Sequence, residues 1–542
     1  MKVKKLNQFI LYSFFISYLI VGIFTLEDYG VNIEEHTQIF SGFYWLNYIF
    51  EFFQIGQFHN EIKIKLDFIS NDKNLPDPEI YTYGPVFDLP IAFFEVWLDI
   101  KDVYLRYAIR HFSIFIIFYL SAIIFFNTLY LRFKNFFVCS AGTLLYIFSP
   151  RIYGDSFHNS KDILFLSLVV FTIFFAFKLF KKIKIKNIIL FSVFAALSTS
   201  TRILGLFLPI SFILFIFFKL INKKKNYLQT LILISFFYII FLIIHWPYLW
   251  ESPISNFLEF YSKSKSWIFS YYILYEGEYY LTDALPDSFI FKWISITTPI
   301  FNLILFFSGI IFLFIRFFKR FISIENISKH KYDLWRSDKE MMDYFIIFNI
   351  TSILLILLFL DVPFVSGWRH LYFLNVFIVY VCSFFLYFYN LKFKDYKKIL
   401  RILFIFFFTF NIYKIILFHP YQSLYFNEFL KEKNSYLVDR DGLSRFDSIN
   451  KILSLEKKKN KINLANASFV PYYRIKDSFR DEKMKKINFV GTEFNQADYI
   501  YNNFVYEVNP EYNDKYKIPQ NFKQIYVLEI DGIKIYEIYR KN

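Results

Sequence analysis

The sequence has little of what soluble enzymes and disulfide-bonded domains depend on. Only two cysteines occur, Cys139 and Cys382, and both fall in apolar stretches. This excludes a disulfide framework, a thiolate metal site and a redox pair. The motifs GxxxxGK[ST], strand-linked GxGxxG, HExxH, GxSxG and paired CxxC are all absent, so we expect neither ATP-driven nor nicotinamide chemistry.

Long apolar runs are what the chain does have. Apolar residues make up 56% of the 542 positions, and the mean hydropathy is positive, which favours a bilayer over several soluble domains. Windows of about 19 residues predict about eleven transmembrane helices. The predicted spans lie near 9–26, 104–131, 135–149, 162–180, 187–200, 203–218, 227–246, 289–316, 342–361, 370–391 and 399–418.

The net charge of +15 does not indicate a nucleic-acid partner, because Lys and Arg sit in short clusters between the spans. By the positive-inside rule the clustered side is cytoplasmic, and it includes the N-terminus. No small-residue cleavage site follows the first span, so we expect an uncleaved signal anchor in contact with membrane lipids. The basic clusters begin at Lys2, Arg132, Lys181, Lys223, Arg316 and Lys392.

The opposite side receives the large loops 27–103 and 247–288. Within the first loop, Thr37–Phe53 is too polar to span but rich in aromatic residues, which predicts an amphipathic helix at the interface. In the second loop, acidic residues alternate with tyrosines. That mix suits either a lid over a sugar or a solvated interfacial helix, and we favour the helix.

From 419 to 542 the chain turns polar and is long enough for a small folded domain. Short strand patterns begin at Ile462, Ile487 and Ala497, and YVLEIDGIKIYEIY predicts a hairpin that turns at Asp531-Gly532. The predicted fold is therefore an all-α polytopic membrane unit, residues 1–418, with interfacial helices and a small α/β extracytoplasmic domain, residues 419–542.

The first outer loop begins with a cluster of acidic residues. EDYGVNIEEH places Asp28, Glu34, Glu35 and His36 just beyond the first span. A carboxylate here is suited to deprotonate an acceptor hydroxyl or amine. The alternative is a solvated acidic loop, and both interpretations remain open, because ionisable groups at membrane depth usually mark a function.

A second polar cluster lies between the third and fourth spans, in SPRIYGDSFHNSKD. His158, Asn159 and Lys161 suit a polar ligand. The alternative is a helix start, with Ser160 as the N-cap and Asp162 near the helix N-terminus. We expect the helix start to account for Asp162 but not for His158 and Asn159.

Two arginines mark further outer turns. Arg202 lies in STSTRILG, and Arg369 with His370 lies in PFVSGWRHLYF. A guanidinium group there either binds a substrate phosphate with its planar fork or contacts lipid headgroups. Both interpretations remain open for both arginines.

Together these residues resemble the GT-C glycosyltransferases, which include the protein O-mannosyltransferases and the aminoarabinose transferase of lipid A. The motifs EDYGVNIEEH, SPRIYGDSFHNSKD, STSTRILG, SGWRHLYF and HPYQSLYFNEFL resemble those of the dolichyl-phosphate-mannose-protein mannosyltransferase-like branch, from Asp28 to about Phe429. The resemblance implies a polyprenyl-phosphate-linked donor, inversion at the sugar carbon, and a first-loop carboxylate as base.

In that branch the acidic pair is usually Asp-Glu, which falls on Glu34-Glu35, so the resemblance makes Glu34 the base. The exchange of Asp for Glu moves the carboxylate by about an ångström, and Glu35 or Asp28 are the substitutes. The resemblance also makes Arg202 and Arg369 the candidates for holding the donor phosphate, with Lys161 and His370 as weaker ones.

No cofactor is firmly predicted. Some relatives bind a divalent metal, and Glu34, Glu35, His36 and His158 are suitable ligand types, but no spacing demands a metal site. The metal therefore stays an open question.

The sequence thus predicts a glycosyltransferase of the bacterial inner membrane that moves a sugar from a polyprenyl-phosphate donor to an extracytoplasmic acceptor. The alternatives are a flippase for lipid-linked glycans, which would need charges inside its spans, an O-antigen polymerase or ligase, and a non-catalytic scaffold. The sugar, the lipid carrier and the acceptor class are not specified.

Overall fold

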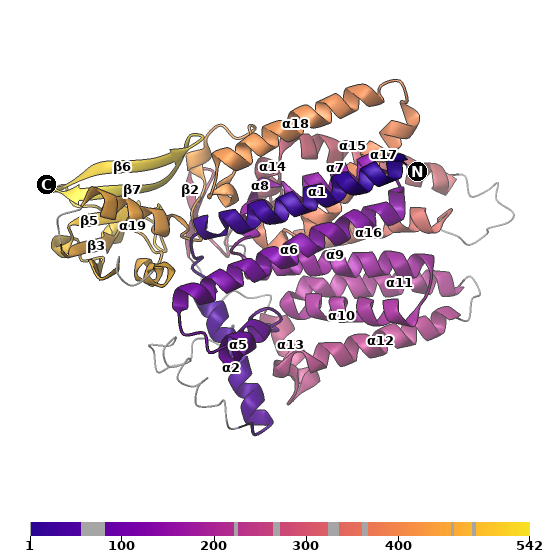
Figure 1. Cartoon of the computed structure of the whole chain (residues 1–542), viewed down its shortest axis with the longest axis horizontal. Helices are drawn as coiled ribbons and strands as arrows, with labels where there is room; N and C mark the ends of the chain where they lie inside the picture. Colours follow the sequence, from indigo (N-terminus) through magenta and orange to yellow (C-terminus); the bar gives the residue numbers. More distant parts are fainter. Residues whose placement is uncertain are drawn as a thin grey trace.

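The computed structural model describes residues 2–55, 82–221, 226–263, 271–322, 335–359, 367–456, 460–479 and 484–542. A bundle of long helices forms most of the molecule, and a small sheet-containing region is attached to one end of it (Figure 1). The N-terminus lies at the opposite end of the bundle. Residues 56–81 of the predicted first outer loop lie outside the described residues.

Nine helices in the described part of the chain are long and apolar enough to cross a membrane. They are α1 (Lys2–Thr25), α6 (Val103–Phe133), α9 (Ser160–Lys181), α11 (Phe207–Ile221), α12 (Asn226–Ile244), α15 (Ile300–Ile322), α16 (Asp338–Phe359), α17 (Leu374–Lys392) and α18 (Lys397–Leu417). Two shorter apolar helices, α7 (Phe136–Ile147) and α10 (Ile185–Thr201), lie among them. In the described part of the chain, these nine helices and the two shorter ones together match the predicted count of about eleven, but the shorter two fall below the length of a full span.

Polar residues cap the N-terminal ends of several bundle helices. Asp102 caps α6 by accepting from the backbone N–H of Tyr104, and Asn135 caps α7 in the same way. At α9 the N-cap is Asn159 and not Ser160 as predicted. The Asn159 side chain reaches the N–H of Asp162, while the Ser160 hydroxyl donates to Gln38 instead.

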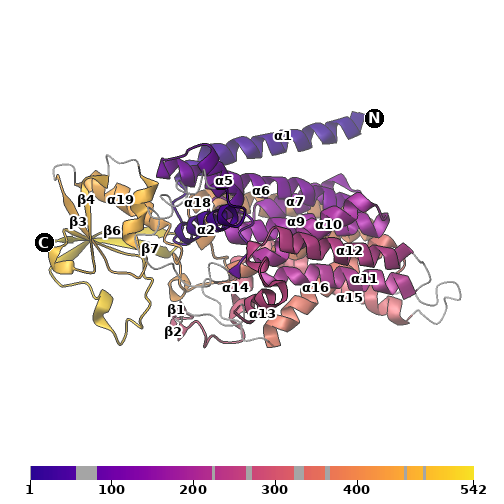
Figure 2. The ribbon, with the colours of Figure 1, turned by 90° about the horizontal axis from the view of Figure 1, so that it is seen from below.

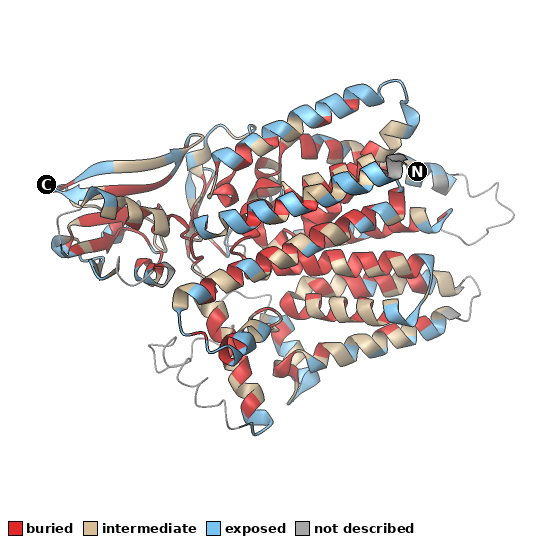
Figure 3. Ribbon diagram, viewed as in Figure 1, coloured by how far each residue is buried: buried red, intermediate tan, exposed pale blue. Residues whose placement is uncertain are grey.

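Burial separates the centre of the bundle from its rim. Of the most apolar window of α9, 83% is buried, against 17% for α12 and 22% for α1, so α9 is central and the other two face outward. Figure 2 shows α1 on the outside of the bundle, and Figure 3 shows buried residues concentrated on the central helices. The exposed residues of the outer helices are largely apolar, as a lipid-facing surface requires.

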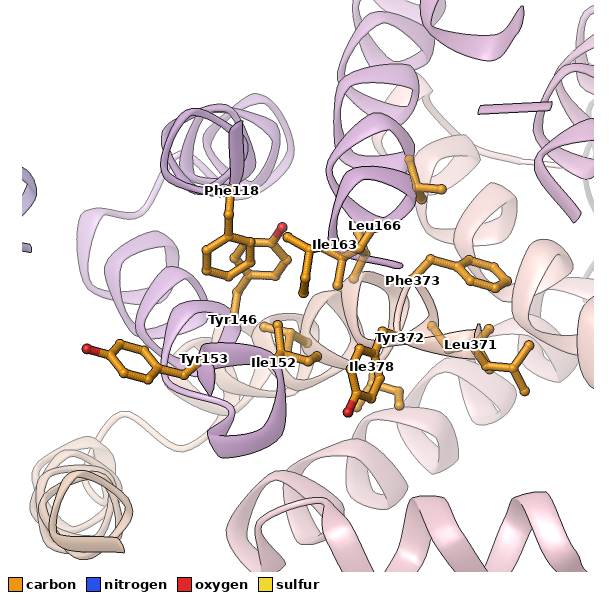
Figure 4. Packing of buried hydrophobic residues seen from close by; sticks show 14 of the residues in the cluster. Phe118, Tyr146, Ile152, Tyr153, Ile163, Leu166, Leu371, Tyr372, Phe373 and Ile378 are labelled. Atoms are coloured by element: carbon orange, nitrogen blue, oxygen red, sulfur yellow. The ribbon is translucent and has the colours of Figure 1, made fainter. Parts of the chain in front are cut away.

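The core continues to the end of the bundle that carries the sheet. Figure 4 shows Ile152 of α8 (Pro150–Asp155), Ile163 of α9 and Leu371 of η6 (Arg369–Leu371) packed together, and all three are fully buried. Each lies within a few residues of a polar side chain singled out in the sequence. The packed core therefore fixes the backbone from which those polar groups project.

The first outer segment contains two helices, α2 (Glu35–Phe52) and α5 (Asp88–Trp97). The predicted helix at Thr37–Phe53 is thus present as α2. Its buried face, with Ile39 and Phe43, packs against Ala92 and Val96 of α5.

The second outer segment holds α13 (Pro253–Lys263), β1 (Tyr272–Tyr275), β2 (Glu278–Leu281) and α14 (Phe289–Thr297). The stretch of alternating acidic residues and tyrosines is a β-hairpin, so the interfacial helix expected there is wrong. The reason is local, because Glu276 and Gly277 both adopt positive φ at the turn and alternation favours strands.

After α18 the chain forms α19 (Ser444–Leu455) and a five-stranded sheet of order β4-β3-β5-β7-β6. β3 lies parallel to β4 and β5, whereas β7 is antiparallel to β5 and β6. The predicted hairpin turns at Asp531-Gly532, both with positive φ. The strands are β3 (Ile462–Asn466), β4 (Ile487–Gly491), β5 (Tyr499–Asn502), β6 (Phe522–Ile530) and β7 (Ile533–Lys541).

Candidate active site

Charged side chains from distant parts of the chain meet in one set of ion pairs. Glu34 comes from the loop before α2, Asp162 from the first turn of α9, and Arg369 from η6. Arg440 and Asp441 come from the loop between α18 and α19. These five residues and Arg202 form one connected set of ion pairs, which we call the arginine–carboxylate network.

Glu34 lies between two guanidinium groups. Its Oε1 accepts a hydrogen bond from Arg369 Nη2 and one of 2.5 Å from Arg440 Nη1. The Glu34 side chain is 31% exposed, whereas that of Arg369 is 4% exposed. The carboxylate can therefore be reached from outside the protein, while the arginine that holds it is buried.

Arg369 is the centre of the network. Besides Glu34, its Nη1 donates to Asp441 Oδ1 at 3.0 Å, and its Nε lies 3.7 Å from Asp162 Oδ2. Asp162 in turn accepts from Arg202 Nη2. Three arginines and three carboxylates thus alternate, and the formal charge of the network is zero.

The network keeps Glu34 ionised. Burial would raise the pKa of Glu34, but the charges of Arg369 and Arg440 outweigh burial and hold that pKa well below its ordinary value. For His370, burial and the nearby Arg202 charge lower the pKa well below its ordinary value. At neutral pH the site therefore holds a carboxylate and a neutral imidazole.

Lys161 extends the positive side of the site. Its Nζ lies 3.4 Å from the centroid of the Tyr83 ring, a cation–π contact. Lys161 precedes Asp162 in the first turn of α9, so its ammonium group projects from the helix end that carries the network.

The adjacent acidic pair separates in the fold. Glu35 is 4% exposed, and its carboxylate accepts from Asn32 N at 2.7 Å and contacts His111 Nε2 at 2.9 Å. Glu35 therefore lies outside the network, where it contacts Asn32 of the loop and His111 of α6. His36 follows it, half-buried, in the first turn of α2.

Of two other predicted site residues, Asp28 has no ion pair with the network, and Asn159 contacts the network only through Asp162. Asp28 pairs with His419 at 2.9 Å, and its side chain is 53% exposed. Asn159 caps α9, and its amide nitrogen donates to Asp155 and Asp162. Neither residue has a contact with Glu34 in the described structure.

His158 is buried without a hydrogen bond on either ring nitrogen among the described residues. Burial lowers its pKa to about 3, so the ring is neutral. With Glu35, His111 and Arg110 it lines a cavity of about 10 Å³, large enough for about one water molecule. Within the described ranges no three His, Cys, Asp or Glu side chains are grouped as metal ligands.

The loop that presents Glu34 is held by the segment that presents Arg440. Ile33 N donates to Asp441 O at 3.1 Å, and Arg445 Nη2 donates to Val31 O at 2.7 Å. A Cβ on Gly30 would lie 2.9 Å from the Leu443 carbonyl oxygen, so this close approach requires glycine. We call this contact between residues 30–34 and 439–445 the loop clamp.

The contributions of Arg440 and Asp441 were not predicted from the sequence, and Asp162 was predicted only as part of the helix start. VDRDGLSR does concentrate charge in the polar tail, which was the available signal. Nothing in the local pattern connects that segment with the first loop, because the contact spans 406 positions.

No protein-family model and no curated protein sequence matches the chain. The apo oligosaccharyltransferase of Archaeoglobus fulgidus matches with a TM-score of 0.44 and 10% identity, over 89% of this chain and 65% of that one. ArnT from Cupriavidus metallidurans matches in the apo state, with a TM-score of 0.46 and 9% identity over 97% of each chain. Its structure with undecaprenyl phosphate matches with a TM-score of 0.44 and 9% identity, over 97% of this chain and 98% of that one.

An oligosaccharyltransferase and ArnT are thus among the solved structures that the chain resembles. The identities are 9–10% and the TM-scores are under 0.5, so no family, substrate or activity is assigned from them. The chemistry of the site therefore follows only from the residues that form it.

Proposed function

We propose that this chain is a GT-C-type glycosyltransferase that moves a sugar from a polyprenyl-phosphate donor to an acceptor hydroxyl or amine. The observation that carries the proposal is the position of Glu34 between Arg369 and Arg440. A partly exposed carboxylate beside two guanidinium groups combines a base for the acceptor with cations for a leaving phosphate.

In the proposed reaction the acceptor oxygen or nitrogen forms a bond to the anomeric carbon of the sugar. The bond from that carbon to the phosphate oxygen breaks, and its electron pair leaves on the polyprenyl phosphate. The acceptor proton passes to the Glu34 carboxylate. The phosphate gains one negative charge, which Arg369 and Arg440 stabilise, and Lys161 lies at the same end of α9.

The acceptor is proposed to approach from the outer face of the membrane. Asp162 of the network lies in the first turn of α9, whereas the basic residues Lys181, Lys182 and Lys184 lie at or just after the other end of that helix. By the positive-inside rule those basic junctions are cytoplasmic. This orientation puts the sheet and α19 on the acceptor side.

Transfer of radiolabelled sugar tests the proposal, with the purified chain in liposomes and a panel of polyprenyl-phosphate sugars as donors. Glu34→Gln should lower the transfer rate by about 10²–10⁴-fold, the usual contribution of a general base. Glu27→Gln is the matched control, because Glu27 is an exposed glutamate at the start of the same loop. Equal rates for Glu34→Gln and wild type would remove Glu34 as the base, and no transfer by wild type from any donor would reject the function.

A further inference from the structure

The resting site holds its candidate base and its candidate phosphate-binding groups against each other. Both hydrogen bonds from Arg369 and Arg440 fall on the same Glu34 oxygen, Oε1. Arg369 is also engaged by Asp441, and Arg440 also donates to the Tyr271 hydroxyl at 3.1 Å. No donor is needed to balance the charges of this arrangement.

Such a carboxylate is a poor base. Two guanidinium partners stabilise its ionised form and so reduce its affinity for a proton. The same contacts occupy the planar N–H groups that would bind a phosphate. The site as folded is therefore complete in its residues but not arranged for transfer.

An incoming phosphate can change this arrangement. It offers several oxygens to the guanidinium forks, and planar bidentate pairing with phosphate is what arginine does best. The Glu34 side chain is 31% exposed, so it can move outward without crossing the core. Asp441 would remain beside both arginines, at 3.0 Å from Arg369 and 3.4 Å from Arg440.

We propose that the donor releases its own base: its phosphate replaces Glu34 on Arg369 and Arg440, and the freed carboxylate then takes the proton of the acceptor. This inference rests on the proposed function and deepens it. It makes Arg440, from the chain after the last span, a second phosphate-binding residue.

Competition between Glu34 and the phosphate for the two arginines would weaken binding of the lipid phosphate. If Glu34 competes with the phosphate for the same two guanidinium groups, its removal increases the fraction of sites ready to bind phosphate. A substitution that abolishes transfer should therefore strengthen binding of the lipid phosphate. A base that contacts only the acceptor would not compete with the lipid phosphate for these arginines.

The test measures binding of undecaprenyl phosphate to the purified full-length chain in nanodiscs, by microscale thermophoresis, without any sugar transfer. Glu34→Gln should lower the Kd about tenfold, and Arg440→Gln should raise it by about as much. Glu27→Gln should match wild type, which controls for a general change in charge. Thermal unfolding of each variant checks that it is folded.

The outcomes are distinct. Tighter binding by Glu34→Gln together with weaker binding by Arg440→Gln supports the release of Glu34 by phosphate. If Glu34→Gln binds the lipid phosphate no more tightly than wild type does, while the wild-type chain transfers sugar and Glu34→Gln does so more slowly, the release of Glu34 is overturned and the proposed function remains. A folded wild type that neither binds undecaprenyl phosphate nor transfers sugar from any donor overturns both.

Discussion

Arg440 donates a hydrogen bond of 2.5 Å from Nη1 to Oε1 of Glu34, although the two residues are 406 positions apart. One comes from the loop after the first span and the other from the chain after the last. The site is therefore built jointly by the bundle and by the segment that leads into α19. A boundary at residue 418 separates the chain by composition, but it cuts through the network.

Replacement of Arg440 by lysine keeps the charge and removes the planar fork. Lysine cannot hold Glu34 and the Tyr271 hydroxyl at once as Arg440 does, so the Kd for undecaprenyl phosphate should rise about fivefold. The matched control is Arg474→Lys, because Arg474 contacts a tyrosine hydroxyl at the surface. Equal affinities for both variants would show that the fork of Arg440 is not used.

The two neighbouring glutamates should respond differently to amide substitution. Glu35→Gln disturbs a buried contact with His111 and Asn32, so it should lower the free energy of unfolding by about 1–3 kcal/mol. Glu34→Gln should instead lower the transfer rate by about 10²–10⁴-fold. Thermal unfolding and initial transfer rates measure the two effects, and the reverse pattern would exchange the roles of the two residues.

Asp155 should make stability depend on pH. Burial, with the nearby Asp441 charge, raises the pKa of Asp155 from 3.8 to about 8. Between these values the folded chain holds a proton that the unfolded chain has released, so the free energy of unfolding falls as pH rises from about 4 to about 8. Asp155→Asn removes this slope, because an amide does not ionise.

The check is the melting temperature of wild type and Asp155→Asn at pH 5 and pH 8.5. The melting temperature of wild type should fall more between pH 5 and pH 8.5 than that of Asp155→Asn. Parallel losses in the two chains would contradict the assignment, since the other titrating groups are present in both.

Arg445 should be a structural residue of the loop clamp. It is 1% exposed and donates to the carbonyls of Gly442, Pro471 and Val31. Arg445→Lys leaves buried carbonyls without donors and should lower the free energy of unfolding by about 2–4 kcal/mol. Arg540→Lys is the control, because Arg540 makes a surface ion pair with Glu456. Identical melting curves for both variants would argue against the clamp.

Single introduced cysteines should report the orientation in the membrane. Both native cysteines are buried, so a membrane-impermeant maleimide applied to intact cells should label this chain only through a new exposed thiol. Tyr512 is 86% exposed in the C-terminal region, and Tyr512→Cys should be labelled. Lys184→Cys, at the opposite end of the bundle, should react only after the cells are opened. Labelling of Lys184→Cys but not of Tyr512→Cys in intact cells would contradict the proposed topology and support the inverted one.

The sequence alone determined the features that depend on neighbouring residues. Long apolar runs predicted the spans because a helix in a bilayer needs about 20 apolar residues. The dipeptide Asp531-Gly532 predicted the hairpin turn, and both residues adopt the required positive φ. Charge at the ends of the spans singled out Glu34, Arg202 and Arg369, which the fold does bring into one network.

Only the tertiary structure decided which of these groups meet. Glu34 and Glu35 are chemically alike, but one reaches Arg369 and the other turns to His111. From the sequence Asp28 was a possible substitute for Glu34 as the base, but in the structure it pairs with His419. Such pairings depend on the packing of helices hundreds of positions apart, and no local period or propensity encodes them.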